Sequence, residues 1–336
     1  MKHYLFSAAL AATLAIGAPA IGAEYSLSVS LDTGPTHIRN VSMREYAKEL
    51  AERSDGKLEL EIFDSASRYR GPDVATALVQ GAIDIGVPAD QHLGKFVADT
   101  GLLLLPMVYG LPRETLYKMT DGPVGDEVRD RLEQKLGTIV LGRSLDLGHG
   151  TIFSTDSLIA TPADLVGRKV RVPGGAATLE RYRVFEANPV QIAWSDLPQA
   201  LERKTVATIW ATHESVRSAK LWDAGIQYAF DDRQAYVQYV PMVSAAAWNK
   251  LPEDMQTLMK DTWEDMVDGF RDNAAQRQFD SVEINRQNGI TVLLPDAQTM
   301  SEMRENLLAA QPGIVETLKM DPELVAQAAA VLTAEQ

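Results

Sequence analysis

The spacing of apolar residues predicts alternating strands and helices in the first part of the chain. Alternation of apolar and polar residues indicates strands, whereas apolar residues recurring every three or four positions indicate helices. The expected elements are strands at 25–31, 58–62 and 83–87, a helix capped by Thr36 and ended by Gly56, and a helix from Pro72 to Gly81. This β-α-β-α-β order predicts an α/β domain with a largely parallel sheet.

The same alternation continues after residue 110, although no sequence repeat is present. The expected elements are helices at 114–135 (interrupted at Gly122 and Pro123), 180–186 and 197–202, strands at 138–141, 190–192 and 206–210, and a β-rich run at 236–247 interrupted by Pro241. A strand of that length can cross between two domains. We therefore expect a second α/β unit after the first.

Residues 253 to about 286 keep helical apolar spacing without a break in the pattern. At 1.5 Å per residue such a helix is roughly 50 Å long. One domain rarely needs a helix of that length, so it is expected to span two domains. A single surface helix kinked near Gly269 is the alternative.

The segment from Thr161 to Pro198 holds the most informative local pattern. Thr161 and Asp164 form an expected capping box, and Pro162 occupies the first helical position between them. Residues 169–172 then form a short strand that ends at Pro173. Arg171 therefore lies at the carboxyl end of a strand, where open α/β sheets bind ligands. The alternative is a solvated arginine on one face of that strand.

The first 23 residues have the pattern of a secretory signal peptide. Lys2 precedes an apolar run at 8–16 and then small residues, with cleavage expected after Ala20 or Ala23. No later apolar run is long enough to cross a bilayer, so we expect no direct membrane insertion. The roughly 310 mature residues favour two domains over one.

Composition excludes several classes of function. The net charge of −14 argues against nucleic acid as a partner. No cysteine is present. The histidines after the signal peptide are His37, His92, His149 and His213, and none has metal-ligand spacing to another. No nucleophile, base and orienting group share a known motif. We expect no cofactor, no metal and no enzymatic activity; a secreted enzyme is the less favoured alternative.

Several motifs occur in the order typical of one transport family. They are GPTHIRN (34–40), SDGKLELEIF (54–63), ALVQGAIDIG (77–86), GLLLLPMVYG (101–110), TPADLVGRKVRVP (161–173), ANPV (187–190), SDLPQALE (195–202) and WNKLPEDMQ (248–256). The chain resembles the solute-binding subunit of a tripartite ATP-independent periplasmic (TRAP) transporter, of the C4-dicarboxylate-binding type. That resemblance implies an α/β type II periplasmic binding protein: two α/β lobes around a ligand cleft, joined by hinge strands and a long spanning helix.

The resemblance also implies the domain boundaries and the partners. Lobe I would comprise residues 24–147 with about 237–270, and lobe II residues 148–236 with about 271–320, followed by a C-terminal helix or tail at 321–336. The protein would capture a small organic acid in the periplasm and deliver it to the membrane permease subunits.

In the resembled family an arginine in the R-V-P context holds a substrate carboxylate, and Arg171 occupies that place. A second arginine of the family, in a G-x-R pattern, is replaced here by Gly150, and its V-D-G-x-E-N run by residues 206–211. These departures favour a monocarboxylate such as a sugar, hydroxy, keto or aromatic acid, unless His149 replaces the missing arginine as a donor. An amine or zwitterion is the alternative, with Asp32 or Asp90, which follow the first and third strands, receiving the ammonium group. The expected ligand-binding residues are Arg171, Trp210, Trp194, His149, Tyr236, His37, Asp90 and Asp32.

Overall fold

The computed structural model describes residues 23–333 and confirms the expected order of elements in the first lobe. The signal peptide lies almost wholly outside the described residues. The elements are β1 (Tyr25–Ser30), α1 (Ile38–Arg53), β2 (Leu58–Phe63), α2 (Val74–Val79), β3 (Ile85–Gly86), α3 (Asp90–Leu93), α4 (Arg113–Thr120), α5 (Pro123–Leu136) and β4 (Ile139–Val140). The helix expected at 114–135 is interrupted where Gly122 and Pro123 predict it.

The start of α1 differs from expectation, and the strand expected at 83–87 is shorter. The N-cap of α1 is His37, not Thr36, because the His37 Nδ1 atom accepts a hydrogen bond from the Arg39 amide at 3.2 Å. A histidine ring nitrogen is a less common capping group than a hydroxyl, so the sequence pattern favoured the threonine. The change shifts the start of α1 by one residue.

Two sheets form the two lobes. The first has the order β2-β1-β3-β12-β4, in which β1 is parallel to β2 and β3, and β12 (Met242–Val243) is antiparallel to its neighbours. The second has the order β13-β10-β6-β9-β7-β8 and is mixed. Its strands are β6 (Thr151–Ser154), β7 (Lys169–Val172), β8 (Asn188–Gln191), β9 (Thr208–Ala211), β10 (Tyr228–Phe230) and β13 (Thr291–Leu293).

The strand that carries Arg171 lies between two parallel neighbours. β7 pairs in parallel with β8 and with β9, which brings the carboxyl ends of these three strands to one edge of the sheet. The capping box of Thr161 and Asp164 is confirmed, although the turn that it begins is a short 3-10 helix at Pro162–Leu165. The helices of this lobe are α6 (Ala176–Val184), α7 (Leu197–Glu202) and α8 (His213–Ser218).

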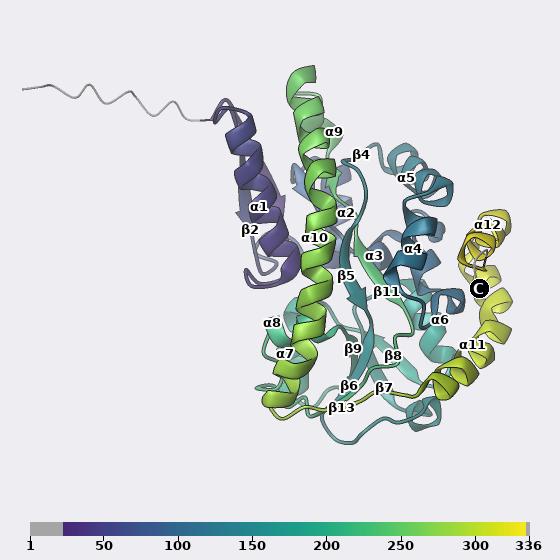
Figure 1. Cartoon of the computed structure of the whole chain (residues 1–336). Coiled ribbons are helices and arrows are strands. Elements are labelled where there is room, and N and C mark those ends of the chain that lie inside the picture. The colour runs from purple at the N-terminus through teal and green to yellow at the C-terminus, as the bar shows by residue number, and fades with distance from the viewer. Residues whose placement is uncertain (1–22, 334–336) are drawn as a thin grey trace, which may run out of the picture.

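A pair of strands and a long helix connect the lobes. Strands β5 (Leu145–His149) and β11 (Tyr236–Tyr239) form an antiparallel pair between the sheets. Helix α10 (Glu253–Gln287) is unbroken through Gly269 and packs on α1, on β5 and on α8, so it runs along both lobes (Figure 1). The expected β-rich run at 236–247 is shorter than predicted, because Ser244 caps the short helix α9 (Ala245–Trp248).

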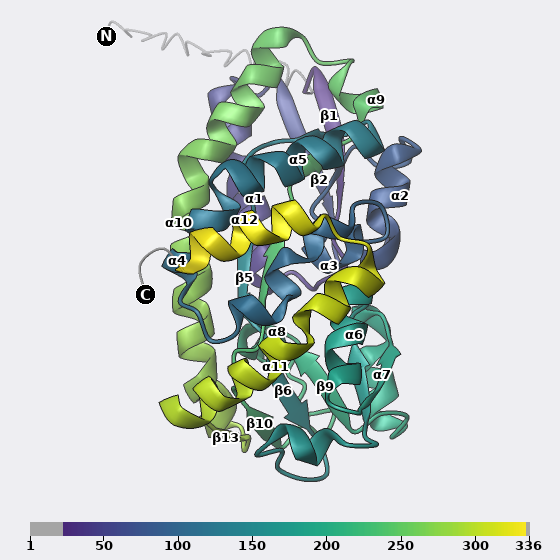
Figure 2. The same ribbon diagram turned by 90° about the vertical axis from the view of Figure 1, so that its right-hand side faces the viewer.

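The C-terminal helices return across the molecule. Helix α11 (Ala297–Leu318) packs against α6, and α12 (Pro322–Thr333) packs against α4, so the end of the chain contacts both lobes (Figure 2). Within residues 23–333, no helix is both long enough and apolar enough to span a membrane.

Candidate ligand-binding site

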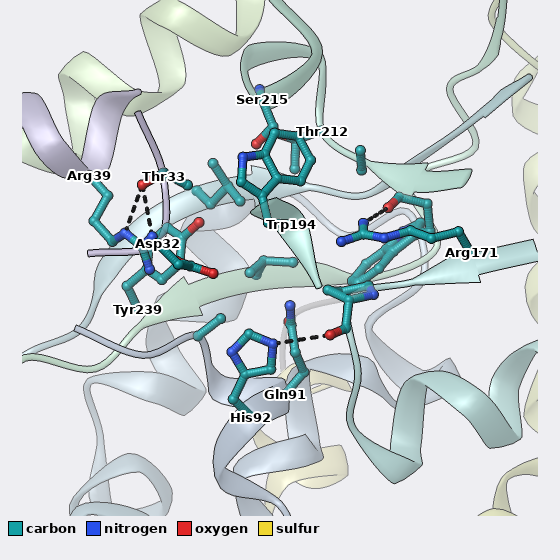
Figure 3. Close-up of a pocket in the computed structure, with 16 residues that line it drawn as sticks. Asp32, Thr33, Arg39, Gln91, His92, Arg171, Trp194, Thr212, Ser215 and Tyr239 are labelled. Atoms are coloured by element: carbon teal, nitrogen blue, oxygen red, sulfur yellow. Dashed lines mark hydrogen bonds and ion pairs between the residues drawn. The ribbon is translucent and has the colours of Figure 1, made fainter. Parts of the chain in front are cut away.

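A cavity lies between the two lobes and receives residues from both (Figure 3). The empty space is about 530 Å³, including the part open to solvent. Its lining comprises Asp32, Thr33, Arg39, Ala89, Gln91 and His92 from the first lobe, Leu147, Val237 and Tyr239 from the connecting strands, and Arg171, Pro173, Trp194, Trp210, Ala211, Thr212 and Ser215 from the second lobe. Four of the expected residues, Arg171, Trp194, Trp210 and Asp32, are thus brought together here.

Arg171 is a buried cation of this cavity, with only 1 % of its surface exposed. Its Nε donates to the Ile192 carbonyl at 2.9 Å and its Nη1 to the Trp210 carbonyl at 3.2 Å. The Nη2 atom has no partner within the described chain. Burial lowers the pKa of Arg171 to about 9, despite the opposing charge of Asp32. An anion that met Nη2 would relieve this cost, because buried charges are stable when they are paired.

Asp32 is already paired with a second arginine that the sequence analysis missed. Arg39, in the first turn of α1, donates from Nη2 to Asp32 Oδ1 and to Thr33 Oγ1, and from Nη1 to the Val87 carbonyl. Burial raises the pKa of Asp32, but the charge of Arg39, together with smaller contributions from His92, the Arg39 hydrogen bond and His37, outweighs that effect and holds the pKa below its usual value. The pair leaves the Asp32 carboxylate largely neutralised. No strand-end signal pointed to Arg39, because it lies in the first turn of α1 and not at the end of β1.

The walls of the cavity are aromatic and apolar. The Arg171 Cζ atom lies 5.6 Å from the ring centroid of Trp194, and the Arg39 Cζ atom lies 4.3 Å from that of Tyr239. Trp210 is buried at the end of β9. A methyl group at residue 150 would overlap the indole nitrogen of Trp210, so only a glycine at this position leaves space for the ring.

Polar atoms complete the first-lobe side of the cavity. Gln91 Oε1 and His92 Nδ1 are buried and have no partner within the described chain. The His92 Nε2 atom lies 3.3 Å from the Pro173 carbonyl oxygen in the opposite lobe, a contact drawn in Figure 3. Burial lowers the pKa of His92 to about 4, so its ring is neutral at pH 7. Because a neutral His92 donates to the Pro173 carbonyl through Nε2, its Nδ1 accepts, and with Gln91 Oε1 it suits hydroxyl groups of a ligand.

Two expected residues face a different cavity. His149 and Tyr236 line a hollow beside α10, together with Arg113, His213 and Phe279. The His149 Nε2 atom is 2.9 Å from the Leu111 carbonyl oxygen, and the Tyr236 hydroxyl donates to Asp146 Oδ2 at 2.7 Å. The pairing of β5 with β11 directs both side chains away from the cavity that contains Arg171.

The remaining two lie next to the cavity without lining it. His37 Nε2 is 3.1 Å from Ser215 Oγ, which does line it. Asp90 follows β3 as expected, but its Oδ1 accepts a hydrogen bond from the Gln91 amide at 2.7 Å, and the neighbouring Ala89 and Gln91 reach the cavity instead.

The buried carboxyl of Asp90 gives a testable pH dependence. Burial raises the pKa of Asp90 to about 8, against smaller opposing effects of the Gln91 and Gln238 amides and of Arg181. The protonated form is therefore favoured by folding, and its contribution to stability is complete below the ordinary aspartate pKa and is lost as the pH rises to about 8. We expect Asp90→Asn to flatten the fall in melting temperature between pH 5 and pH 8. An equally steep fall in the variant would contradict this assignment.

The arrangement is that of a binding site with a fixed positive charge. Within residues 23–333, no cluster of histidine, aspartate and glutamate is placed to hold a metal ion. Two lobes around a buried arginine, hinged by strands and a long helix, define a bilobal solute-binding protein.

Comparison with known proteins identifies the family. Residues 31–312 match the bacterial extracellular solute-binding protein family 7, so the chain belongs to this family. The resemblance to TRAP solute-binding subunits is thereby confirmed, as are the non-enzymatic class and, through the periplasmic proteins of the family, the expected location. The 2,3-diketo-L-gulonate-binding periplasmic protein YiaO of Escherichia coli is 24% identical over 295 residues, which cover 87% of each chain.

Solved structures support the same fold. A TRAP periplasmic solute-binding protein from Sulfurospirillum deleyianum with bound succinate superposes with a TM-score of 0.84 at 21% identity, covering 92% of this chain and 99% of the other. The sugar acid binding protein DctPAm from Advenella mimigardefordensis, in complex with galactonate, gives a TM-score of 0.85 at 19% identity, covering 93% and 98%. These likenesses confirm the two-lobe α/β architecture with its long helix.

Proposed function

We propose that this solute-binding protein captures a small organic monocarboxylate and delivers it to the membrane subunits of a TRAP transporter. One observation carries the proposal: Arg171 Nη2 is a buried N–H donor group of a guanidinium with no partner within the described chain, and it borders the cavity between the lobes. Arginine binds carboxylates strongly through charge-assisted hydrogen bonds. The roles of Trp194, Trp210 and Asp32 in ligand binding belong to the same proposal.

The charge balance favours one carboxylate on the ligand. Two guanidinium groups and one carboxylate line the cavity, and Arg39 already pairs with Asp32. One positive charge therefore remains for the ligand. The relative from Advenella mimigardefordensis binds galactonate, an acid with one carboxylate, which is in keeping with this balance.

The rest of the lining indicates the body of the ligand. Two indole rings and the Leu147 and Val237 side chains offer apolar surface, while the Thr33, Thr212 and Ser215 hydroxyls and the Gln91 amide offer hydrogen bonds. A hydroxy, keto, sugar or aromatic acid presents both kinds of surface. The amine or zwitterion alternative placed Asp32 or Asp90 beside the ammonium group, whereas Asp32 is paired with Arg39 and Asp90 does not line the cavity.

Contacts across the cavity are in keeping with capture by lobe closure. Besides His92 and Pro173, the Arg70 Nη1 atom of the first lobe lies 3.1 Å from Asp196 Oδ2 of the second. Closure of two lobes encloses a ligand and is the form in which binding proteins of this architecture hold their solute. Delivery to the permease is part of the proposal and is implied by the family.

The test is a binding screen on the mature protein with acids and their neutral counterparts. Benzoate, gluconate and 2-hydroxybutyrate would each be compared with the corresponding amide, and simple amines would be added as a separate set. A ligand at a hundred times its dissociation constant stabilises the protein by about 2.7 kcal/mol, which a thermal shift detects. We expect at least one acid to stabilise the protein and its amide to have no effect. Stabilisation by amines alone would refute the proposal.

A further inference from the structure

A further buried arginine, Arg181, lies directly behind Trp210. Arg181, on α6, has no exposed surface, and its Cζ atom lies 4.9 Å from the ring centroid of Trp210. Its Nη1 donates to the Leu104 carbonyl at 3.4 Å, a long hydrogen bond. Its Nε and Nη2 atoms have no partner within the described chain. A guanidinium in this state retains most of its capacity to bind an anion.

The groups around Arg181 do not neutralise it. No carboxylate of the described chain lies within ion-pair distance of its guanidinium, and the nearby Asp232 instead accepts a hydrogen bond from Gln234 Nε2. Burial raises the pKa of Asp232 to about 8, against the lowering effects of Gln234 and Arg181, so this carboxyl is mainly protonated at neutral pH. Further buried acceptors without a partner are Tyr182 Oη, Asp232 Oδ1 and Gln234 Oε1. Arg181 thus has no ion-pair partner within the described chain, and burial lowers its pKa despite smaller opposing effects of Tyr182 and Asp232.

Trp210 separates this charge from the ligand cavity. The indole lines the cavity that contains Arg171, whereas Arg181 does not, and the guanidinium of Arg181 lies over the indole ring. The cation–π contact stabilises the guanidinium without a counterion. A second carboxylate on a ligand that reached Trp210 would meet the indole instead of a cation, and would lose its hydration without compensation.

We propose that Trp210 determines ligand specificity by shielding Arg181, so that the site accepts one carboxylate and discriminates against dicarboxylates. This inference rests on the proposed function, because it assumes that Arg171 holds the first carboxylate. A smaller side chain at residue 210 would expose Arg181 to the cavity and would convert the site into one with two cations. Trp210 thus determines whether the site prefers one or two carboxylates, because its side chain separates Arg181 from the ligand.

The experiment compares matched acids by isothermal titration calorimetry. The probes are benzoate with isophthalate and propionate with succinate, each pair differing by one carboxylate. We expect the wild-type protein to bind at least one monocarboxylate about tenfold more tightly than the matching dicarboxylate. The second carboxylate would lose its hydration in the cavity without meeting a cation. Trp210→Ala should lower that preference at least about tenfold, and Trp210→Phe should lower it less. The smaller change in Trp210→Phe provides a variant that keeps an aromatic ring in the core.

Arg181→Met supplies the matched control. Combined with Trp210→Ala it should restore the preference for the monocarboxylate, whereas alone it should leave monocarboxylate affinity within about threefold, because the indole still separates residue 181 from the ligand. An equal gain in dicarboxylate affinity with and without Arg181 would overturn the inference, as would a wild-type protein that binds both members of a pair equally. In either case a carboxylate still binds, and the proposed organic-acid function stands. If the wild-type protein binds no carboxylate at all, the proposed function fails and this inference fails with it.

Discussion

Arg171→Met is expected to reduce affinity for the carboxylate ligand by about thirtyfold or more, since truncating one partner of a buried charge pair costs about 2–5 kcal/mol or more. The ligand-free protein should change little in melting temperature. The variant loses the hydrogen bonds to the Ile192 and Trp210 carbonyls, but it also loses a buried charge whose pKa burial lowers to about 9. The measurement is a calorimetric titration combined with thermal unfolding of both proteins without ligand.

Lys169→Met is the control for this change. Lys169 lies two residues earlier on the same strand, is exposed, and does not line the cavity. We expect the affinity of this variant for the carboxylate ligand to stay within about twofold of the wild-type value. Solvent screens the charge of an exposed lysine that lies far from the ligand. Full binding by Arg171→Met would show that another group holds the ligand, and the monocarboxylate proposal would be abandoned.

Asp32→Asn is expected to destabilise the protein by about 3–5 kcal/mol, the usual effect of leaving one member of a buried ion pair without its partner. Arg39 would keep its charge in a site where its side chain is only 3% exposed. Arg39→Met should have a similar cost, because it leaves the Asp32 carboxylate unpaired. The double variant should recover much of the loss, since neither charge then remains. Urea unfolding at pH 7 gives the four free energies of this double-mutant cycle.

The Asp32–Arg39 pair also predicts how the stability of the protein changes at low pH. The pKa of Asp32 is held below its ordinary value, so its contribution to stability is present above the ordinary aspartate pKa and is lost as the pH falls through the lower folded value. Asp32→Asn should lack this component of acid unfolding. Additive single and double variants would show that the two side chains do not depend on each other, contrary to the geometry.

Local sequence patterns were sufficient for most of the secondary structure. The capping box at Thr161, the strand at 169–172 and the helix from Glu253 each depend on neighbouring residues, and each is present in the structure. Hydrophobic periodicity and end signals act over a few residues, so they can be recognised without knowledge of the fold. The errors occurred at element ends, where His37 replaces Thr36 as a cap and α9 ends the expected strand run.

The sequence alone identified only some of the residues that line the cavity. Arg171 and Asp32 follow from their places at strand ends, which the sequence indicates. Arg39, Gln91 and His92 were missed, because they reach the cavity from the first turns of α1 and α3, and residues of that type occur on most exposed helices. His149 and Tyr236 were expected in the same cavity, but the register of β5 against β11 places them in another one.

The sequence by itself determined the order of strands and helices, the family, and the strand-end position of Arg171, because each of these depends on residues close together along the chain. The tertiary structure decided which charges remain available to a ligand. The charge of Asp32 is paired with that of Arg39, and Arg181 is covered by Trp210, while Arg171 keeps a free N–H group at the cavity. Ion pairing and shielding depend on distances of a few ångströms between separate elements, and only the packing of the two lobes sets those distances.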